Sequence, residues 1–171
     1  MNPRTTERPN TIALQWDGKF EEGRAQGAIY PGMALEVTTD EAHPQQFPIG
    51  VKANSIAGSA LPVRIAIEDR LGNIANTILG KTIETAYAAD DLVPYVIPNS
   101  GDTLQVRVAQ NSNFAMGAPL KLHTDGTFIA HGGTGTLVAM VAEAFNWSTG
   151  KDSKGVTNTS NTRPLLRVQF N

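Results

Sequence analysis

The chain has 171 residues, with 14 Lys and Arg against 16 Asp and Glu, which gives a formal net charge of -2. This length predicts one domain, and the near-neutral charge argues against a basic nucleic-acid binder. Hydrophobic residues make up 40% of the chain, 16 glycines and 10 prolines interrupt the apolar runs, and cysteine is absent. We therefore expect a folded core without long helices, disulfides, thiolate zinc sites or cysteine nucleophiles.

The N-terminal segment 1–10 is predicted to be an extended arm. It contains Pro3, Arg4, Arg8 and Pro9 and has no apolar pattern, so it cannot form a core by itself, and it lacks the apolar segment of a secretory signal. Proline cannot donate a ladder hydrogen bond, and arginine forms two-pronged contacts with carboxylates. The arm is therefore expected to lie along a partner surface, with a disordered tail as the alternative.

From residue 11 onward the chain predicts a single domain of short strands, 11–171. Turns are expected at Asp17-Gly18, Glu22-Gly23 and Pro31-Gly32, and a strand is expected over Leu61–Ile67. The longest uncharged stretch, roughly 128–142, is too short and too rich in glycine to span a bilayer. We expect a soluble protein made in the cytoplasm.

The second half of the chain also favours strands. Residues 104–108 alternate strictly, which predicts one buried face with Leu104, Val106 and Val108 and an exposed face with Gln105 and Arg107. Over 136–145 a helix competes with a strand, and we favour the strand because a glycine turn at 132–135 precedes β-branched residues. Residues 148–163 are polar and predict a mobile loop or a long hairpin tip, and 165–170 predict a terminal strand.

A short pattern recurs along the chain. Residues 32–40 align with 117–125 at Gly, Leu, an aliphatic residue, Thr and Asp, and 101–106 repeat the first half. The pattern predicts a glycine turn that leads into a strand with inward Leu, closed by an Asx-type turn at Thr-Asp. A repeat of hairpins and a chance similarity both remain open, but all three segments are expected to be strands.

No constellation of residues predicts catalysis, a metal or a cofactor. The histidines lack metal-ligand spacing and are interpreted as structural; they are His43, His123 and His131. The neighbouring acids at 40–41, 68–69 and 90–91 point to opposite faces of a strand, so they are interpreted as solvated turns. Ser59 lacks a nucleophile-elbow context, and the glycines at 132–135 lack the lysine of a phosphate loop.

Five ordered pieces carry a resemblance to a known family. They are Pro31-Gly32-Met33-Ala34-Leu35-Glu36, Ala66-Ile67-Glu68-Asp69, a piece from Tyr87 to Val93, Gly101-Asp102-Thr103-Leu104, and Gly117-Ala118-Pro119-Leu120 with Asp125-Gly126. In this order and spacing the chain resembles the capsid decoration, or cement, proteins of tailed bacteriophages. It departs from them by the polar loop at 148–163 and by Ala89, where a glycine would be expected.

The resemblance implies a small β-rich protein, barrel-like or sandwich-like, with no enzymatic activity. It implies binding to the outside of an expanded head, where the major capsid protein is the partner, commonly as a homotrimer. The expected location is the virion exterior after synthesis in the host cytoplasm, with neither nucleic acid nor membrane as a partner. Contact residues are expected in the arm and at Trp16; the arm's candidates are Pro3, Arg4, Arg8 and Pro9.

The sequence leaves two alternative functions open. The first is a β-sandwich carbohydrate-binding or fibre-type adhesion domain, in which Trp16, Trp147 and tyrosines would stack on sugars. A buried or interface-lining tryptophan is the more common role for both residues. The second is a small hydrolase, which ranks last because no triad or metal spacing is present.

Overall fold

The computed structural model of the chain describes residues 12–40, 49–55, 62–68, 85–109, 112–146 and 165–171. Within these ranges it contains strands and turns and no helix, so the prediction of a mainly β fold is confirmed. The strands are β1 (Ala13–Gln15), β2 (Lys19–Ala25), β3 (Leu35–Thr39), β4 (Ile49–Ala53), β5 (Ile65–Ala66), β6 (Leu92–Ile97), β7 (Thr103–Arg107), β8 (Asn113–Phe114), β9 (Pro119–Leu122), β10 (Phe128–Ala130), β11 (Ala139–Val141), β12 (Phe145–Asn146) and β13 (Leu165–Phe170).

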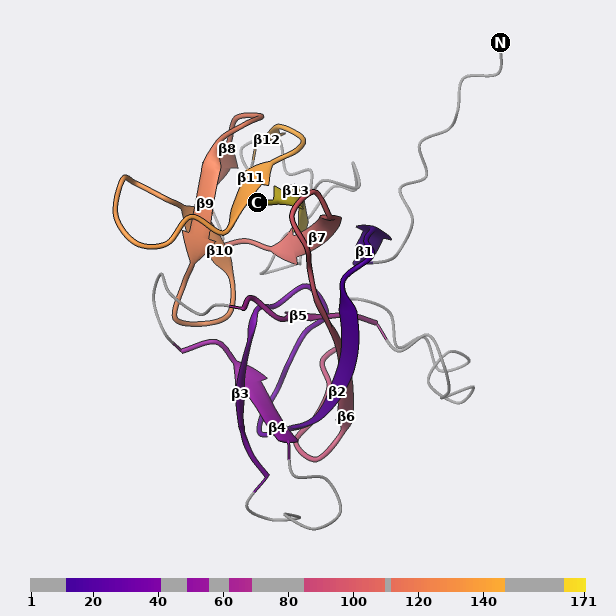
Figure 1. The fold of residues 1–171 in the computed structure, drawn as a ribbon. Helices are drawn as coiled ribbons and strands as arrows, with labels where there is room; N and C mark the ends of the chain where they lie inside the picture. The colour runs from indigo at the N-terminus through magenta and orange to yellow at the C-terminus, as the bar shows by residue number, and fades with distance from the viewer. Residues whose placement is uncertain (1–11, 41–48, 56–61, 69–84, 110–111, 147–164) are drawn as a thin grey trace.

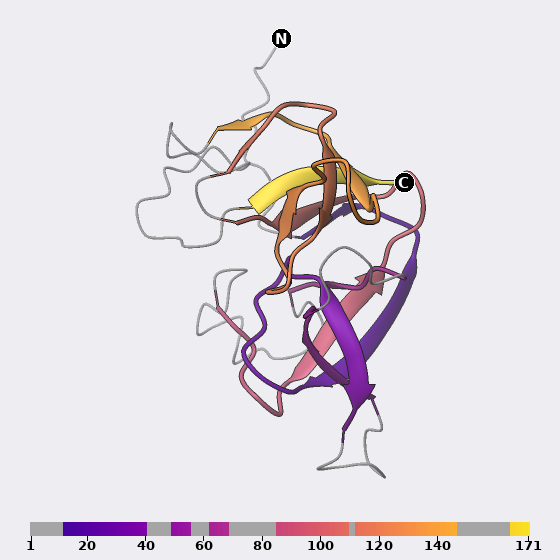
Figure 2. The same cartoon turned by 90° about the vertical axis from the view of Figure 1, so that its left-hand side faces the viewer.

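The strands form two main sheets that lie one above the other (Figure 1). The six-stranded sheet has the order β1-β7-β13-β11-β9-β10, and the five-stranded sheet has the order β3-β4-β2-β6-β5. Strands β12 and β8 form a small separate pair. Figure 2 gives the side view, with the orange and yellow strands of the second half in the upper sheet. All named strand pairs are antiparallel except β2 with β4.

Each main sheet curls so that two segments that are not neighbours in the strand order meet at a single β-bridge. In the five-stranded sheet, Ala34, just before β3, makes a bridge with Ile65 of β5. In the six-stranded sheet, Val108, just after β7, makes a bridge with Phe128 of β10. A single bridge leaves most of each edge open, so the architecture is sandwich-like and is not a closed barrel.

Two clusters of buried side chains hold the sheets together. The larger one lies between the sheets and combines residues of the upper sheet with Ala34, Val63, Ile65, Ile67 and Val96 from the lower one. The smaller one belongs to the five-stranded sheet; its members are Ala25, Ile29, Leu35, Val51, Ala66, Tyr87, Val93 and Tyr95. Because residues of both sheets enter the larger cluster, burial of apolar surface joins the two sheets.

The recurrent pattern is one structural unit, which we name the bulged turn. In each bulged turn the fourth residue donates its N–H to the carbonyl of the first, and the third residue has a positive φ. The turns span 30–33, 88–91, 99–102 and 115–118, and φ is 88° at Gly32, 70° at Asp90, 94° at Gly101 and 78° at Gly117. The prediction of strands after glycine turns is thus confirmed for its three segments, and the turn at 88–91 is a fourth member.

The turn at 131–134 has the same hydrogen bond and a positive φ at Gly133, but the four turns above share a further feature: each pairs with the last residue of another strand. The N–H of its third residue donates to that residue's carbonyl, and the carbonyl of its fourth residue accepts from the same residue's N–H, at 2.7–3.0 Å. These residues are Ala66 of β5, Ala25 of β2, Phe170 of β13 and Val141 of β11. The third and fourth residues of each turn therefore lie opposite a single residue of the other strand. This arrangement is a β-bulge whose first residue has a left-handed conformation.

The third residue after the positive-φ residue of each bulged turn is buried. These residues are Leu35, Val93, Leu104 and Leu120, and each is at most 1% exposed. The family resemblance places a glycine at position 89, where this chain has Ala89. The left-handed residue of this turn is Asp90, so the backbone of Ala89 does not require glycine.

One face of β7 is buried although the sequence predicted it to be exposed. The strand over 104–108 and its buried Leu104 are confirmed, but Gln105 and Arg107 are each only 1% exposed, so both faces are buried. The Arg107 Nε donates to the carbonyl of Pro31 at 2.9 Å, and its guanidinium lies 5.8 Å from the centre of the Tyr30 ring. The first bulged turn therefore covers the face that alternation assigned to solvent.

Other local predictions fared unevenly. The terminal strand 165–170 is confirmed as β13, and 136–145 contributes strand, not helix, through β11 and the start of β12. The turn at Glu22-Gly23 is wrong, because both residues lie inside β2; a Cβ at Gly23 would stand 2.5 Å from Val51 Cγ1. The strand over 61–67 shrinks to β5. The arm 1–10 and the loop 148–163 lie outside the described residues.

Candidate functional site

The predicted contact residues fall into two groups. Pro3, Arg4, Arg8 and Pro9 lie outside the described residues. Trp16 lies between β1 and β2, is half-buried, and packs against the larger core cluster. One side of the indole therefore supports the core, and the remainder is available to a partner.

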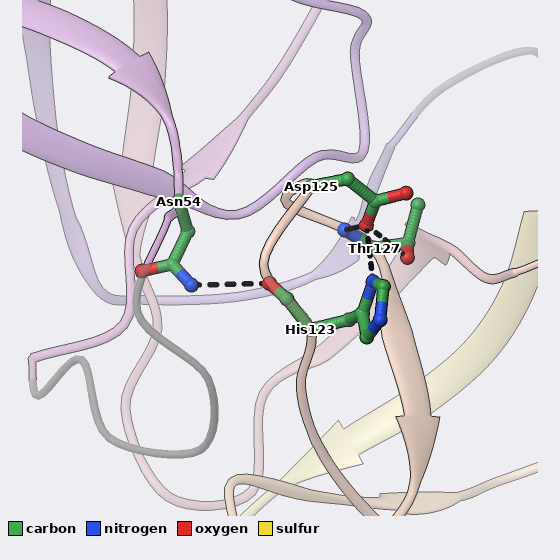
Figure 3. Close-up of polar contacts among 4 residues, drawn as sticks. All are labelled: Asn54, His123, Asp125 and Thr127. Carbon is green, nitrogen blue, oxygen red and sulfur yellow. Dashed lines mark hydrogen bonds and ion pairs between the residues drawn. The ribbon is translucent and has the colours of Figure 1, made fainter.

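A polar cluster lies where the two sheets meet (Figure 3). The turn after β9 brings His123, Asp125 and Thr127 together, and Asp125 Oδ1 accepts hydrogen bonds from the Thr127 N–H at 3.0 Å and from the Thr127 hydroxyl. The His123 Nδ1 lies 3.0 Å from the same oxygen. A side chain that binds the main chain two residues ahead is an Asx turn, so this part of the sequence prediction is confirmed.

The cluster also connects the sheets. Asn54, which follows β4, is fully buried and donates from Nδ2 to the His123 carbonyl at 3.2 Å. A second contact joins the sheets nearby: the N–H of Ala34, just before β3, donates to the Gly126 carbonyl at 2.8 Å. A Cβ at Gly126 would stand 2.8 Å from the Ala34 carbonyl oxygen, and its φ is 78°, so only glycine fits this contact.

The environment of Asp125 changes its acidity. Partial burial acts to raise its pKa, but the hydrogen bonds from the Thr127 hydroxyl, His123 and the Thr127 N–H outweigh burial and leave the pKa below its ordinary value. Asp125 is therefore an anion at neutral pH. Its charge is used to hold the turn.

The order of groups in this cluster does not suit nucleophilic catalysis. In a hydrolytic triad the imidazole stands between the hydroxyl and the carboxylate. Here the carboxylate of Asp125 stands between His123 and Thr127, and the threonine hydroxyl is directed to the carboxylate. The cluster can hold the two sheets in register, and the imidazole of His123 contacts the carboxylate rather than the threonine hydroxyl.

Several other titratable groups in the described ranges have partners of their own. His131 Nε2 lies 2.8 Å from the Gly135 carbonyl, while His43 lies outside the described residues. Asp40 contradicts its interpretation as a solvated turn, because it is 0% exposed and pairs with Arg24 Nε at 3.1 Å. Within the described ranges, no three His, Asp or Glu side chains gather as a metal ion would require.

Two of the three tyrosine hydroxyls donate to groups of the protein. Tyr87 donates to the carbonyl of Ile67 at 2.8 Å, and Tyr95 donates to Glu21 Oε2 at 2.8 Å. Burial, followed by the hydrogen bond to Glu21, raises the pKa of Tyr95 to about 12. Both rings belong to the smaller core cluster, so neither can stack on a sugar.

Exposed large apolar side chains mark the surface that sequence reasoning missed. Four of them lie on the five-stranded sheet and two on the upper part of the chain; they are Phe20 (43%), Val37 (39%), Ile49 (37%), Leu92 (47%), Met116 (73%) and Leu137 (40%). Met116 occupies the second position of a bulged turn, ahead of Gly117. Exposed apolar side chains of this kind can contribute to protein–protein interfaces.

Membrane insertion through a helix has no candidate in the described part of the chain, since none of it forms a helix long and apolar enough to cross a bilayer. Comparison with known sequences gave no matching family model and no matching curated protein. Among solved structures, the fold is similar to the N base of the head fiber gp8.5 of bacteriophage phi29, with a TM-score of 0.49 and 14% identity over 91% of this chain and 95% of that one. At that level of similarity, the function has to be argued from the residues of this chain.

Proposed function

We propose that this chain is a non-catalytic structural protein that binds the outside of an expanded tailed-phage head and stabilises it. The observation that carries the proposal is the ordered set of sequence pieces that resemble the decoration proteins. Four of the five pieces overlap the bulged turns. The remaining piece, the second along the chain, begins at Ala66, which is the residue that pairs with the first bulged turn. The resemblance therefore lies in the part of the chain that builds the sheets.

The described surface is compatible with an adhesive role. Its prominent features are scattered apolar side chains, a half-buried Trp16 and strand edges, and its polar clusters are engaged within the protein. Binding of this kind gains from several weak contacts made at once. We propose the major capsid protein as the partner and a homotrimer as the bound form, with no nucleic acid or membrane involved.

The carbohydrate-binding alternative gains no support from the described tyrosines and Trp16, the residues that it would use. Tyr87 and Tyr95 are buried, Tyr30 lies near the guanidinium of Arg107, and Trp16 packs against the core. Trp147 lies outside the described residues. A sugar platform would require adjacent exposed rings on one face.

The proposal is tested by co-sedimentation with empty phage heads. Purified protein is mixed with expanded heads and, as a matched control, with unexpanded heads of the same phage, and native mass of the free protein is measured in parallel. Saturable binding to expanded heads alone, with a stoichiometry that is a multiple of three, is the expected result. Absence of binding across a panel of tailed-phage heads would overturn the proposal, and a protein that is monomeric both in solution and on heads would overturn the trimer.

A further inference from the structure

Strand β6 contains a proline at a position where a strand normally donates a main-chain hydrogen bond. Pro94 is the third residue of β6, and β6 has β2 on one side and β5 on the other. Proline has no N–H, so within sheets it is usually confined to edge strands, strand ends and bulges. A proline inside a strand with two neighbours leaves an acceptor on one of them without its usual donor.

The strand register identifies this acceptor as the carbonyl of Ile67. The pairing of Ala66 with Tyr95 places Ile67 opposite Pro94, and the Ile67 N–H donates to the Pro94 carbonyl at 2.9 Å. Two residues paired in this way in an antiparallel ladder normally exchange both N–H to carbonyl bonds. The return bond to the Ile67 carbonyl would need the N–H that proline lacks.

A side chain occupies the place of the missing donor. The Tyr87 hydroxyl donates to the Ile67 carbonyl at 2.8 Å, and both residues are buried. Tyr87 is itself held by two main-chain hydrogen bonds with Ile29, at 2.7 and 3.1 Å, and its ring packs in the smaller core cluster. A buried carbonyl without a donor is costly, so the hydroxyl removes a cost that the proline would otherwise impose.

This hydrogen bond supports a short strand that joins the two sheets. Strand β5 has only two residues, and Ile67 follows directly after them. On one side of Ile67, Ala66 pairs with the first bulged turn, which covers Arg107 of β7. On the other side, the Glu68 carboxylate accepts a hydrogen bond of 2.8 Å from the N–H of Ile12, which precedes β1. The position of Ile67 therefore bears on two contacts with the six-stranded sheet.

We propose that the Tyr87 hydroxyl serves as the main-chain donor that Pro94 lacks, and that it thereby extends the pairing of β5 with β6 by one residue. Tyr87 is a positioning residue for Ile67. The two residues are then interdependent, because a residue with an N–H at position 94 would make the hydroxyl dispensable. Tyr95 lies in the same core cluster but differs in this respect, since its hydroxyl donates to the side chain of Glu21.

The first test is a double-mutant cycle between Tyr87→Phe and Pro94→Val, measured by urea unfolding. Tyr87→Phe alone should raise the equilibrium constant of unfolding about fivefold to tenfold. Pro94→Val supplies an N–H to the Ile67 carbonyl, so its effect on that constant should be more favourable in the Tyr87→Phe protein than in the wild type, by more than about twofold.

Tyr95→Phe is the matched control for this cycle. It also removes a hydroxyl from the smaller core cluster, but Pro94→Val cannot replace the hydrogen bond that it loses. The coupling of Tyr95→Phe with Pro94→Val should therefore stay within about twofold. The proposal is wrong if the coupling of Tyr87→Phe with Pro94→Val is also that small, has the opposite sign, or is matched by the control.

The second test leaves the proline unchanged and follows hydrogen exchange by NMR in the wild-type and Tyr87→Phe proteins. Loss of the hydroxyl should accelerate exchange of the Ile67 N–H by about threefold or more beyond the acceleration at Gly23, which pairs with Val93 in the β2–β6 ladder. Equal acceleration at both sites would mean that the hydroxyl adds only to overall stability, which would overturn its role at Ile67. Neither test involves phage heads, so failure here is separable from failure of the proposed function.

Discussion

The N–H of Asp90 donates a hydrogen bond of 2.9 Å to the carbonyl of Ala25, the last residue of β2. In the three other bulged turns the equivalent donor is glycine, and Asp90, at a φ of 70°, is the sole residue other than glycine with a positive φ in the described structure. One member of a repeated unit therefore carries a conformational cost that the others avoid.

Replacing Asp90 with glycine should increase stability. The change removes the cost of a left-handed residue with a side chain, partly offset by the greater freedom of glycine in the unfolded chain, so we expect a gain of about 0.5 kcal/mol. Urea unfolding measures it. The reverse change at the equivalent site, Gly101→Ala, should lose about 1 kcal/mol, because the added Cβ meets no atom within 4 Å and only the φ of 94° opposes it.

Removing the buried cation at position 107 should destabilise the protein strongly. Arg107→Met preserves much of the side-chain volume but leaves the Pro31 carbonyl without its donor, which we expect to cost about 2 to 3 kcal/mol. Arg167→Met is the matched control, since Arg167 is exposed on the neighbouring β13, and its cost should stay within about 0.5 kcal/mol. Equal thermal shifts in the two variants would contradict the role assigned to Arg107.

Stability should decline in acid in part through Asp125. The pKa of Asp125 is lowered in the folded protein, so its contribution is present above the unfolded-state pKa, near 4, and is lost as pH falls through the folded value. Glu36 acts in the same direction, because hydrogen bonds from the Ser55 hydroxyl and N–H lower its pKa.

Asp125→Asn tests this contribution. Because Asp125 is 43% exposed, we expect a loss of only about 0.5 to 1 kcal/mol at pH 7 and a flatter decline of stability below pH 4. Denaturant unfolding between about pH 2 and pH 7 measures both. The exposed Glu22→Gln on β2 is the control, and a pH profile for Asp125→Asn that overlays the wild-type profile would count against the charge-holding role.

Deleting residues 1–10 should leave the melting of the core nearly unchanged while weakening attachment to phage heads. The proposed reason is that Arg4 and Arg8 contact carboxylates on a partner, so their contribution should fade as salt rises. Co-sedimentation at low and high salt measures it. If the truncated protein binds as tightly as the full chain at both, the arm is only a tail.

Strand positions with strong local signals could be predicted from the sequence. The terminal strand 165–170 alternates and ends the chain, and glycines before Leu35, Leu104 and Leu120 mark the bulged turns. Turn chemistry depends on the conformational freedom of single residues, so short windows reveal it.

Contacts between distant segments could not be predicted in this way. Alternation assigned Arg107 to solvent, yet Pro31 and Tyr30 cover it, and they stand more than seventy residues away along the chain. Gly23 resembles a turn residue, but it lies inside β2, where the side chain of Val51 leaves no room for a Cβ. Likewise, the burial of Asp40 depends on Arg24 from another strand. Long-range packing overrides local propensity at each of these sites.

The bulged turns make their linking hydrogen bonds through main-chain atoms alone. Inside three of the turns, the side chain of the fourth residue (Met33, Asp91 or Asp102) also accepts a hydrogen bond from the N–H of the first residue. The link to the neighbouring strand itself needs only one residue that tolerates a left-handed conformation, and a buried aliphatic residue follows three positions later. Such a framework can exchange nearly every other residue over evolutionary time and still assemble in the same way. Relatives of this protein could therefore share its fold while having few identical residues beyond the glycines of the bulged turns.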